Sequence, residues 1–283
     1  MSTTPAPDLI VGRHIQVYNP QIGRGRIRYA LFDFDGTLSL IRAGWQEVML
    51  AQCLDELKKT STDESREELR RVCLDFITRL TGKQTIYQMF QLVEEISKRG
   101  GTPRDALDYK REYLDLLNLK IAHKLDALRS GRDPASCYQV RGSVDLLEGL
   151  KQRGTTCFLA SGTDEEFVDD EVELLDLASY FDGGIYGARD DYKSFSKKKL
   201  IERIFSENEL QGPELVVFGD GYVEIENGVE AGGIAVGAAT LESGAVGWDE
   251  WKRGRLLEVK ADLLVPDWGE ADQLLTYLFV EEE

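Results

Sequence analysis

Two carboxylates stand two residues apart where an apolar segment ends. Asp33 and Asp35 belong to the run Leu-Phe-Asp-Phe-Asp-Gly-Thr, which closes on Gly36 and Thr37. Acids this close repel each other, so a plain apolar core would avoid the pair. A bound metal ion, or proton transfer by an acid and base, makes such an arrangement useful. The pair therefore indicates chemistry at the end of a strand.

Three further segments carry polar groups after apolar stretches or at a helix start. Ser161, followed by Gly162 and Thr163, predicts a hydrogen-bonding cradle for an anion at the start of the next helix. Asp220, between two glycines, ends another apolar run. Three lysines, 197–199, open a predicted helix, where the helix dipole disfavours cations unless an anion lies nearby. Each segment alone is typical of a turn or a solvated helix face, but their joint order favours one shared site.

The second half of the chain alternates apolar runs with helical patterns, and these elements must position the polar groups. Strands are predicted at 29–35, 155–161, 184–187, 215–220, 234–238 and 261–265. Helices are predicted at 143–153, 165–178, 196–206 and 271–278, with a shorter turn near Glu224. This alternation predicts an α/β fold, a Rossmann-like and mostly parallel sheet with helices on both faces. Ligands bind such sheets at the carboxyl ends of the strands.

Residues 42–135 follow another pattern, because they contain helical segments and no convincing strand. One apolar helix face is formed by Leu69, Val72, Cys73, Phe76, Ile77 and Leu80. We expect residues 42–135 to be an all-helical cap domain inserted into a core domain of residues 27–41 and 136–283. Residues 1–26 form an N-terminal extension that could add an edge hairpin.

Composition narrows the function classes. The 283 residues include 34 Lys and Arg against 51 Asp and Glu, a net charge of −17, which disfavours nucleic acid and anionic membranes as partners. No apolar run is long enough to span a membrane, and the first residues do not resemble a secretory signal, so a cytoplasmic protein is expected. The four cysteines are expected to be reduced core residues. His14 and His123 have no acid or cysteine cluster around them and receive no role.

The order of these segments resembles the haloacid dehalogenase-like hydrolase superfamily over nearly the whole chain. Its first motif, Asp-x-Asp-x-Thr, matches Asp33, Asp35 and Thr37, and its second, a Ser or Thr ending a strand, matches Ser161. Its acid pair after a later strand is matched by two residues, Asp220 and Glu224. The lysine motif fits Lys197 best, with Lys193 and Lys198 as alternatives.

The resemblance implies phosphoryl transfer through an aspartyl-phosphate. Asp33 would be the nucleophile, and Asp35 would be the general acid and later the base. Ser161 and Lys197 would bind phosphate oxygens. Dehalogenases of the family lack the second acid, because a halide needs no proton, so Asp35 favours a phosphate ester.

The same resemblance implies Mg²⁺ as cofactor. The Asp33 carboxylate, the Asp35 backbone carbonyl and Asp220 would hold the ion, and Glu224 would orient a metal-bound water or the lysine. The expected substrate is a small phosphorylated metabolite such as a sugar phosphate or phosphoglycolate. Candidate substrate-binding residues are Thr37, Gly162, Thr163, Arg42, Trp45 and Lys83. A phosphosugar mutase and a non-catalytic ligand sensor are the alternatives, and the sequence does not decide the oligomeric state.

Overall fold

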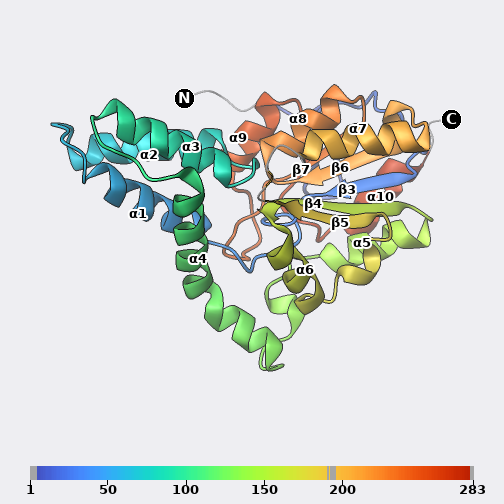
Figure 1. Cartoon of the computed structure of the whole chain (residues 1–283). Helices are drawn as coiled ribbons and strands as arrows, with labels where there is room; N and C mark the ends of the chain where they lie inside the picture. Colours follow the sequence, from blue (N-terminus) through green and yellow to red (C-terminus); the bar gives the residue numbers. More distant parts are fainter. Residues whose placement is uncertain (1–4, 190, 192–195, 281–283) are drawn as a thin grey trace.

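The computed structural model describes residues 5–189, 191 and 196–280. An eight-stranded sheet is covered by helices, and a group of helices lies to one side of it (Figure 1). The strands are β1 (Leu9–Val11), β2 (Ile15–Val17), β3 (Tyr29–Phe32), β4 (Thr156–Asp164), β5 (Gly184–Ala188), β6 (Leu215–Gly219), β7 (Ile234–Ala238) and β8 (Leu263–Val265). Their order in the sheet is β1-β2-β8-β7-β6-β3-β4-β5.

The strands from β3 to β8 run parallel, whereas β1 and β2 pair antiparallel at the edge beside β8. After β3 the chain adds β4 and β5 on one side, and then β6, β7 and β8 on the other. The strand order therefore reverses between β3 and β6, and the crevice at such a reversal is where open α/β sheets bind ligands. The predicted mostly parallel α/β sheet is confirmed.

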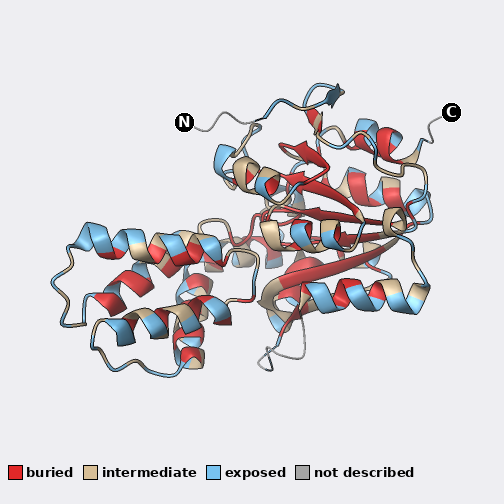
Figure 2. Ribbon diagram, turned by 90° about the horizontal axis from the view of Figure 1, so that it is seen from above, coloured by how far each residue is buried: buried red, intermediate tan, exposed pale blue. Residues whose placement is uncertain are grey.

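Side chains of β3 alternate between two apolar layers. Ala30 and Phe32 belong to the larger core, together with residues of α5 (Ser143–Gln152), α6 (Glu165–Leu174) and α10 (Ala271–Phe279). Leu31 belongs to a second core with residues of α7 (Lys197–Asn208). The remaining helices on that face are α8 (Tyr222–Glu230) and α9 (Glu250–Glu258). Figure 2 shows buried strands between helices whose outer sides are exposed. A strand buried on both faces explains the continuous apolar runs in the sequence.

The stretch between β3 and β4 is helical, as its pattern predicts. It contains α1 (Trp45–Leu57), α2 (Arg66–Arg79), α3 (Ile86–Lys98) and α4 (Ala106–Arg129). Ser65 and Glu68 form a reciprocal capping box at the start of α2, and Leu69, Phe76 and Ile77 on its apolar face are buried. These four helices make up the group that stands beside the sheet in Figures 1 and 2.

Several element boundaries differ from the prediction. β3 ends at Phe32 instead of 35, because the chain turns at Phe34, whose carbonyl accepts three successive N–H groups. β4 continues past 161 to Asp164, since its pairing with β5 resumes there after an irregularity. α6 ends at Leu174 because Asp176 adopts a φ of 56° in the left-handed region. Short 3₁₀ helices follow α4, α6 and α7, at Ala135–Cys137, Ala178–Tyr180 and Gly212–Glu214.

Helix α9 has no counterpart among the predicted elements. In α9 the buried residues are Lys252 and Leu256, so the helix has no apolar stripe for periodicity to detect. Asp249 caps its start by accepting the N–H groups of Trp251 and Lys252. This short capped helix brings a lysine to the sheet edge where the motif residues lie.

β1 and β2 form the edge hairpin, and the His14 side chain, which received no role, pairs with Glu270 at the start of α10. Among the cysteines, Cys137 is exposed instead of buried, because it lies in a 3₁₀ helix without buried residues. No helix among the described residues is long and apolar enough to cross a bilayer.

Candidate active site

One pocket lies at the carboxyl ends of the central strands. Asp33 follows β3, Asp220 follows β6, Ser161 belongs to β4, and Lys197 is the first residue of α7. All four line a pocket with about 790 Å³ of free space, solvent at its mouth included. Ser161 lies inside β4 and not at its end as predicted, because the strand runs on to Asp164.

Asp33 is held in a buried ion pair. Its N–H donates to the carbonyl of Phe218, which continues the pairing of β3 with β6. Lys197 Nζ lies 2.7 Å from Asp33 Oδ1 and 2.9 Å from Glu224 Oε2. Burial raises the pKa of Asp33 well above its usual value, while Lys197 opposes the rise. Burial acts to lower the pKa of Lys197, but the Asp33 and Glu224 carboxylates more than offset this, so the pKa is raised and the ammonium stays charged.

Asp220 is positioned by the turn after β3. Its N–H donates to Thr37 Oγ at 2.9 Å, and that hydroxyl lies 3.4 Å from Asp220 Oδ1. Gly36 has a φ of 78°, and a Cβ built on it would lie 2.1 Å from Asp220 Oδ2. Thr37 is fully buried and its carbonyl accepts the indole N–H of Trp268. Thr37 therefore holds Asp220 and does not line the pocket, which corrects its prediction as a substrate-binding residue.

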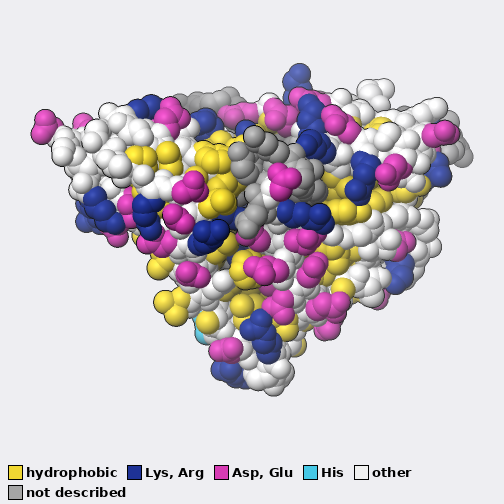
Figure 3. All heavy atoms as spheres, in the orientation of Figure 1, with side chains coloured by type: hydrophobic (Ala, Val, Ile, Leu, Met, Phe, Trp, Pro, Cys, Tyr) yellow, Lys and Arg dark blue, Asp and Glu magenta, His cyan; other side chains and the backbone are white. Residues whose placement is uncertain are grey.

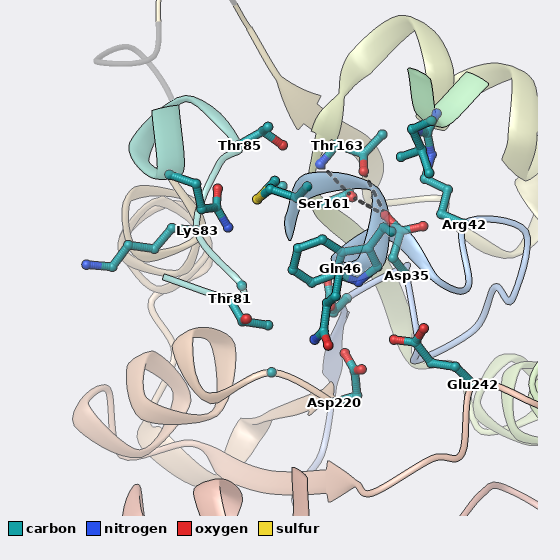
Figure 4. Close-up of a pocket in the computed structure, with 18 of the residues that line it drawn as sticks. Asp35, Arg42, Gln46, Thr81, Lys83, Thr85, Ser161, Thr163, Asp220 and Glu242 are labelled. Carbon is teal, nitrogen blue, oxygen red and sulfur yellow. Dashed lines mark hydrogen bonds between the residues drawn. The ribbon is translucent and has the colours of Figure 1, made fainter. Parts of the chain in front are cut away.

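Asp35, in the same turn, lies among hydroxyl groups. Its Oδ2 accepts the hydroxyl of Thr163 at 2.7 Å and that of Ser161 at 3.4 Å (Figure 4). Its Oδ1 is buried and has no hydrogen-bond partner among the described residues. Burial raises the pKa of Asp35, while the nearby Arg42 guanidinium opposes the rise. A carboxyl with a raised pKa and an unused oxygen is suited to carry a proton.

Three carboxylates form a cluster that fits a divalent cation. Oxygen atoms of Asp33, Asp220 and Glu224 lie within 4.8 Å of one another. Hard oxygen donors of this kind suit Mg²⁺. Glu224, however, is almost fully buried, and its two oxygens accept the Gly221 N–H and the Lys197 ammonium. Of the two roles expected for Glu224, its contacts fit the orientation of the lysine better than that of a metal-bound water, and the Asp35 carboxylate lies outside the cluster.

Arg42 is already paired. Its guanidinium makes two hydrogen bonds to the Glu171 carboxylate of α6, at 2.7 and 3.2 Å, and both side chains are buried. The bidentate pair leaves Arg42 little capacity to bind an anionic substrate, which corrects the prediction for this residue. Glu171 was not predicted, because nothing in the sequence near Arg42 identifies a partner 129 positions away.

The other side of the pocket comes from the inserted helices and the loop before α3. Trp45, a candidate substrate-binding residue, lines it, and so do the unpredicted Gln46, Thr81, Thr85 and Gln88. Figure 4 shows Thr81 and Thr85 across the pocket from Asp220 and Asp35. The insert thus supplies uncharged side chains to the wall that faces the carboxylates.

The backbone of Lys83, in the insert, passes close to Gly162 of β4. A Cβ on Gly162 would lie 3.0 Å from the Lys83 carbonyl, so Gly162 supplies space for the backbone and not the predicted anion cradle. The Lys83 side chain is exposed and, in Figure 4, runs away from Asp35 and Asp220. Of the alternative lysines, Lys193 lies outside the described residues, and Lys198 is exposed and paired with Glu230.

Two further charged residues of the pocket were missed by the sequence analysis. Lys252 of α9 is buried, with Nζ 2.7 Å from Asp220 Oδ2. Glu242, in the loop after β7, accepts the N–H of Gly44 at the start of α1. The lysine could have been suspected from its place after the capping Asp249, where a cation needs an anionic partner.

Comparisons with known proteins give a matching family model and solved structures of similar fold. A family model described as haloacid dehalogenase-like hydrolase matches residues 30–238. No curated protein matches the chain. A structure described as a predicted phosphoglycolate phosphatase from Haemophilus somnus 129PT is 14% identical with a TM-score of 0.58, covering 88% of this chain and 98% of that one.

Two other structures are similar at comparable levels. A family IA, variant 3 hydrolase from Entamoeba histolytica HM-1:IMSS is 19% identical with a TM-score of 0.57, covering 89% of this chain and 99% of that one. A structure described as a putative β-phosphoglucomutase from Bacteroides vulgatus is 14% identical with a TM-score of 0.57, covering 90% and 91%. At these identities the similarity shows the fold.

Proposed function

Because the chain belongs to the haloacid dehalogenase-like hydrolase family, an enzyme family, we propose that it is a Mg²⁺-dependent phosphatase of small phosphate monoesters with an uncharged, hydroxylated leaving group. The observation that carries the proposal is the convergence of Asp33, Asp35 and Asp220 with Lys197 at one end of the sheet. A site that only binds a ligand has no need of a nucleophile beside a carboxyl that can carry a proton.

Asp33 is the proposed nucleophile. Its backbone N–H is fixed on β6, and Lys197 holds one carboxylate oxygen. Attack on phosphorus forms the O–P bond of an aspartyl-phosphate and breaks the bond to the leaving alcohol, so one difficult hydrolysis is divided into two steps. Lys197, held in turn by Glu224, offsets negative charge as the phosphoryl group transfers.

Asp35 is the proposed general acid and base. Its raised pKa favours the protonated form that donates to the departing alkoxide, and the resulting carboxylate then takes a proton from the attacking water. Thr163 and Ser161 hold Oδ2, which leaves Oδ1 for this transfer.

The carboxylate cluster supports a bound Mg²⁺. Asp33, Asp220 and the backbone carbonyl of Asp35 are the proposed ligands, and the ion would neutralise charge between the substrate and these acids. Without such an ion, several carboxylates would repel a phosphate dianion. The two buried lysines of the site are already paired with Asp33 and Asp220 and would offset this repulsion only in part.

The uncharged leaving group follows from the charges around the pocket. Among its described lining residues, the cations are Arg42, Lys83, Lys197 and Lys252. Arg42 and the two buried lysines are each bound to a carboxylate, and Lys83 points away from the catalytic acids. A carboxylate on the leaving group would meet Glu242 instead of an unpaired cation, and burying it would be costly. Hydroxyl groups on the leaving group would form hydrogen bonds with the amides of Gln46 and Gln88 and the hydroxyl of Thr81. A sugar or polyol phosphate is therefore favoured over phosphoglycolate.

The inserted helices are the proposed cap. Tyr222 of α8 donates to the Arg79 carbonyl of α2 at 2.7 Å, and Lys110 of α4 pairs with Asp164 at 2.8 Å. These contacts support a closed arrangement in which residues 42–135 exclude water from the pocket.

The test is phosphate release from a panel of phosphate monoesters, with and without Mg²⁺. We expect Mg²⁺-dependent release that Asp33→Asn lowers by at least about 1000-fold. Within the panel, 2-hydroxyethyl phosphate and phosphoglycolate differ only in a hydroxymethyl or carboxylate group, and the first should be hydrolysed more efficiently. Equal rates of hydrolysis would contradict the proposal that the leaving group is uncharged. Absence of phosphate release from every monoester of the panel would contradict the proposal of a phosphatase.

A phosphosugar mutase is the alternative, since some similar structures are described as β-phosphoglucomutases. A mutase uses the same two aspartates but returns the phosphoryl group to a sugar. Interconversion of sugar phosphate isomers, followed by NMR with little free phosphate, would favour this alternative.

A further inference from the structure

Lys252 occupies a place that disfavours a cation. It is the third residue of α9, its side chain is buried, and it lies where the helix dipole is positive. Removing an ammonium from water is also costly unless an anion accompanies it. A lysine here therefore needs compensating negative charge.

Two carboxylates provide it. Lys252 Nζ lies 2.7 Å from Asp220 Oδ2 and 3.7 Å from Glu242 Oε1. It also donates to Thr240 Oγ at 3.4 Å. Burial acts to lower the pKa of Lys252, but Asp220 and then Glu242 more than offset it, so the ammonium stays charged.

Asp220 is confined from several directions. Lys252 holds Oδ2, Thr37 lies beside Oδ1, and Gly36 leaves no room for the carboxylate to move toward β3. Glu242, the second partner of Lys252, accepts the N–H of Gly44 just before α1. The lysine therefore fixes one carboxylate of the acidic cluster and connects it to the start of the inserted helices.

The charges at the site determine how the contact of Lys252 with Asp220 affects the binding of a metal ion and of phosphate. Asp33, Asp35, Asp220 and Glu224 bring four carboxylates to the site, whereas Lys197 and Lys252 bring two ammonium groups. Each cation opposes a divalent metal ion and attracts a phosphate dianion.

We propose that Lys252 is a positioning residue. It holds Oδ2 of Asp220 and sets how tightly the site binds the metal ion relative to phosphate. The inference rests on the proposed function for the identity of the two ligands. Lys252 weakens the binding of Mg²⁺ and strengthens that of phosphate, because its positive charge repels the cation and attracts the anion.

The test is calorimetric titration of the full chain with Mg²⁺ alone, and with inorganic phosphate at saturating Mg²⁺. Lys252→Met keeps most of the length of the unbranched side chain and removes its charge. We expect it to bind Mg²⁺ at least about tenfold more tightly and phosphate about tenfold more weakly than the unaltered chain. Lys252→Arg, which keeps the charge, should stay within about threefold for both ligands. A loss of packing alone would not move the two affinities in opposite directions.

Glu242→Gln provides an independent variant if Lys252→Met does not fold. It removes one negative charge without touching Asp220, so it should weaken Mg²⁺ binding by about threefold or more. Unchanged or weaker Mg²⁺ binding by a folded Lys252→Met, or tighter binding by Glu242→Gln, would overturn the inference. Because these titrations need no turnover, opposite shifts in a chain that hydrolyses nothing would support Lys252 while contradicting the phosphatase.

Discussion

Two buried charged residues, Arg42 and Glu171, act electrostatically on Asp35. Glu171 pairs with Arg42, and the Arg42 guanidinium in turn acts on the Asp35 carboxyl. A buried ion pair contributes little to stability by itself, but removing one partner leaves an uncompensated charge. The pair therefore couples the state of Glu171 to the environment of the proposed acid.

Glu171 should make stability depend on pH. Burial raises its pKa to about 7, although Arg42 opposes the rise. A carboxyl whose folded pKa is raised contributes stability below its unfolded pKa and loses it as the pH rises through the folded value. Between about pH 5 and about pH 8, the free energy of unfolding should fall by roughly 2 kcal/mol less in Glu171→Gln than in the unaltered chain.

Urea unfolding at several pH values measures this effect. Glu173→Gln is the matched control, because Glu173 is exposed on the same helix. An identical pH dependence in the unaltered chain and Glu171→Gln would contradict the prediction.

At the scale of elements, the turn after β3 decides where the acids of β3 and β6 stand. The turn places Gly36 against Asp220 and Thr37 beneath it, so the loop after one strand fixes the acid of its neighbour. Asp33 and Asp35 follow the last residue of β3, and the Asp33 N–H still donates to the Phe218 carbonyl of β6.

Gly36→Ala should therefore remove activity by displacing Asp220. Gly100→Ala is a matched control, because Gly100 has a similar φ of 72° but nothing within 4 Å of an added Cβ. Both variants should lose about 1–2 kcal/mol of stability to backbone strain, measured by urea unfolding. Phosphate release and Mg²⁺ affinity should fall at least about tenfold in Gly36→Ala alone. Equal losses of activity in both variants would assign the effect to strain.

The whole molecule is strongly acidic, with a net charge of −17, and yet the proposed substrate is an anion. On the face seen in Figure 3, basic side chains are interspersed with acidic ones and form no large patch that could attract phosphate. Long-range electrostatics should therefore slow the approach of substrate, and binding depends on the local groups of the pocket.

Salt should consequently speed the reaction at low substrate concentration. Raising the ionic strength from about 10 to about 150 mM shortens the screening length to roughly 8 Å and should raise kcat/KM about twofold at saturating Mg²⁺. Steady-state kinetics with one substrate measure this. A fall in kcat/KM would indicate that the site attracts its substrate over long range despite the net charge.

Alternating strands and helices, the inserted helices and the order of the polar segments are predictable from the sequence, because apolar runs, glycine turns and helical periodicity are local signals. Asp33 and Asp220 could be expected side by side because parallel strands end at one edge. The pairing of Arg42 with Glu171, the support of Asp220 by Thr37 and the contact of Lys252 with the site became visible only in the folded chain. These contacts link residues over 100 positions apart in two cases, and 32 in the third. A buried charge takes whichever partner the packed elements bring within reach, and no local pattern encodes that choice.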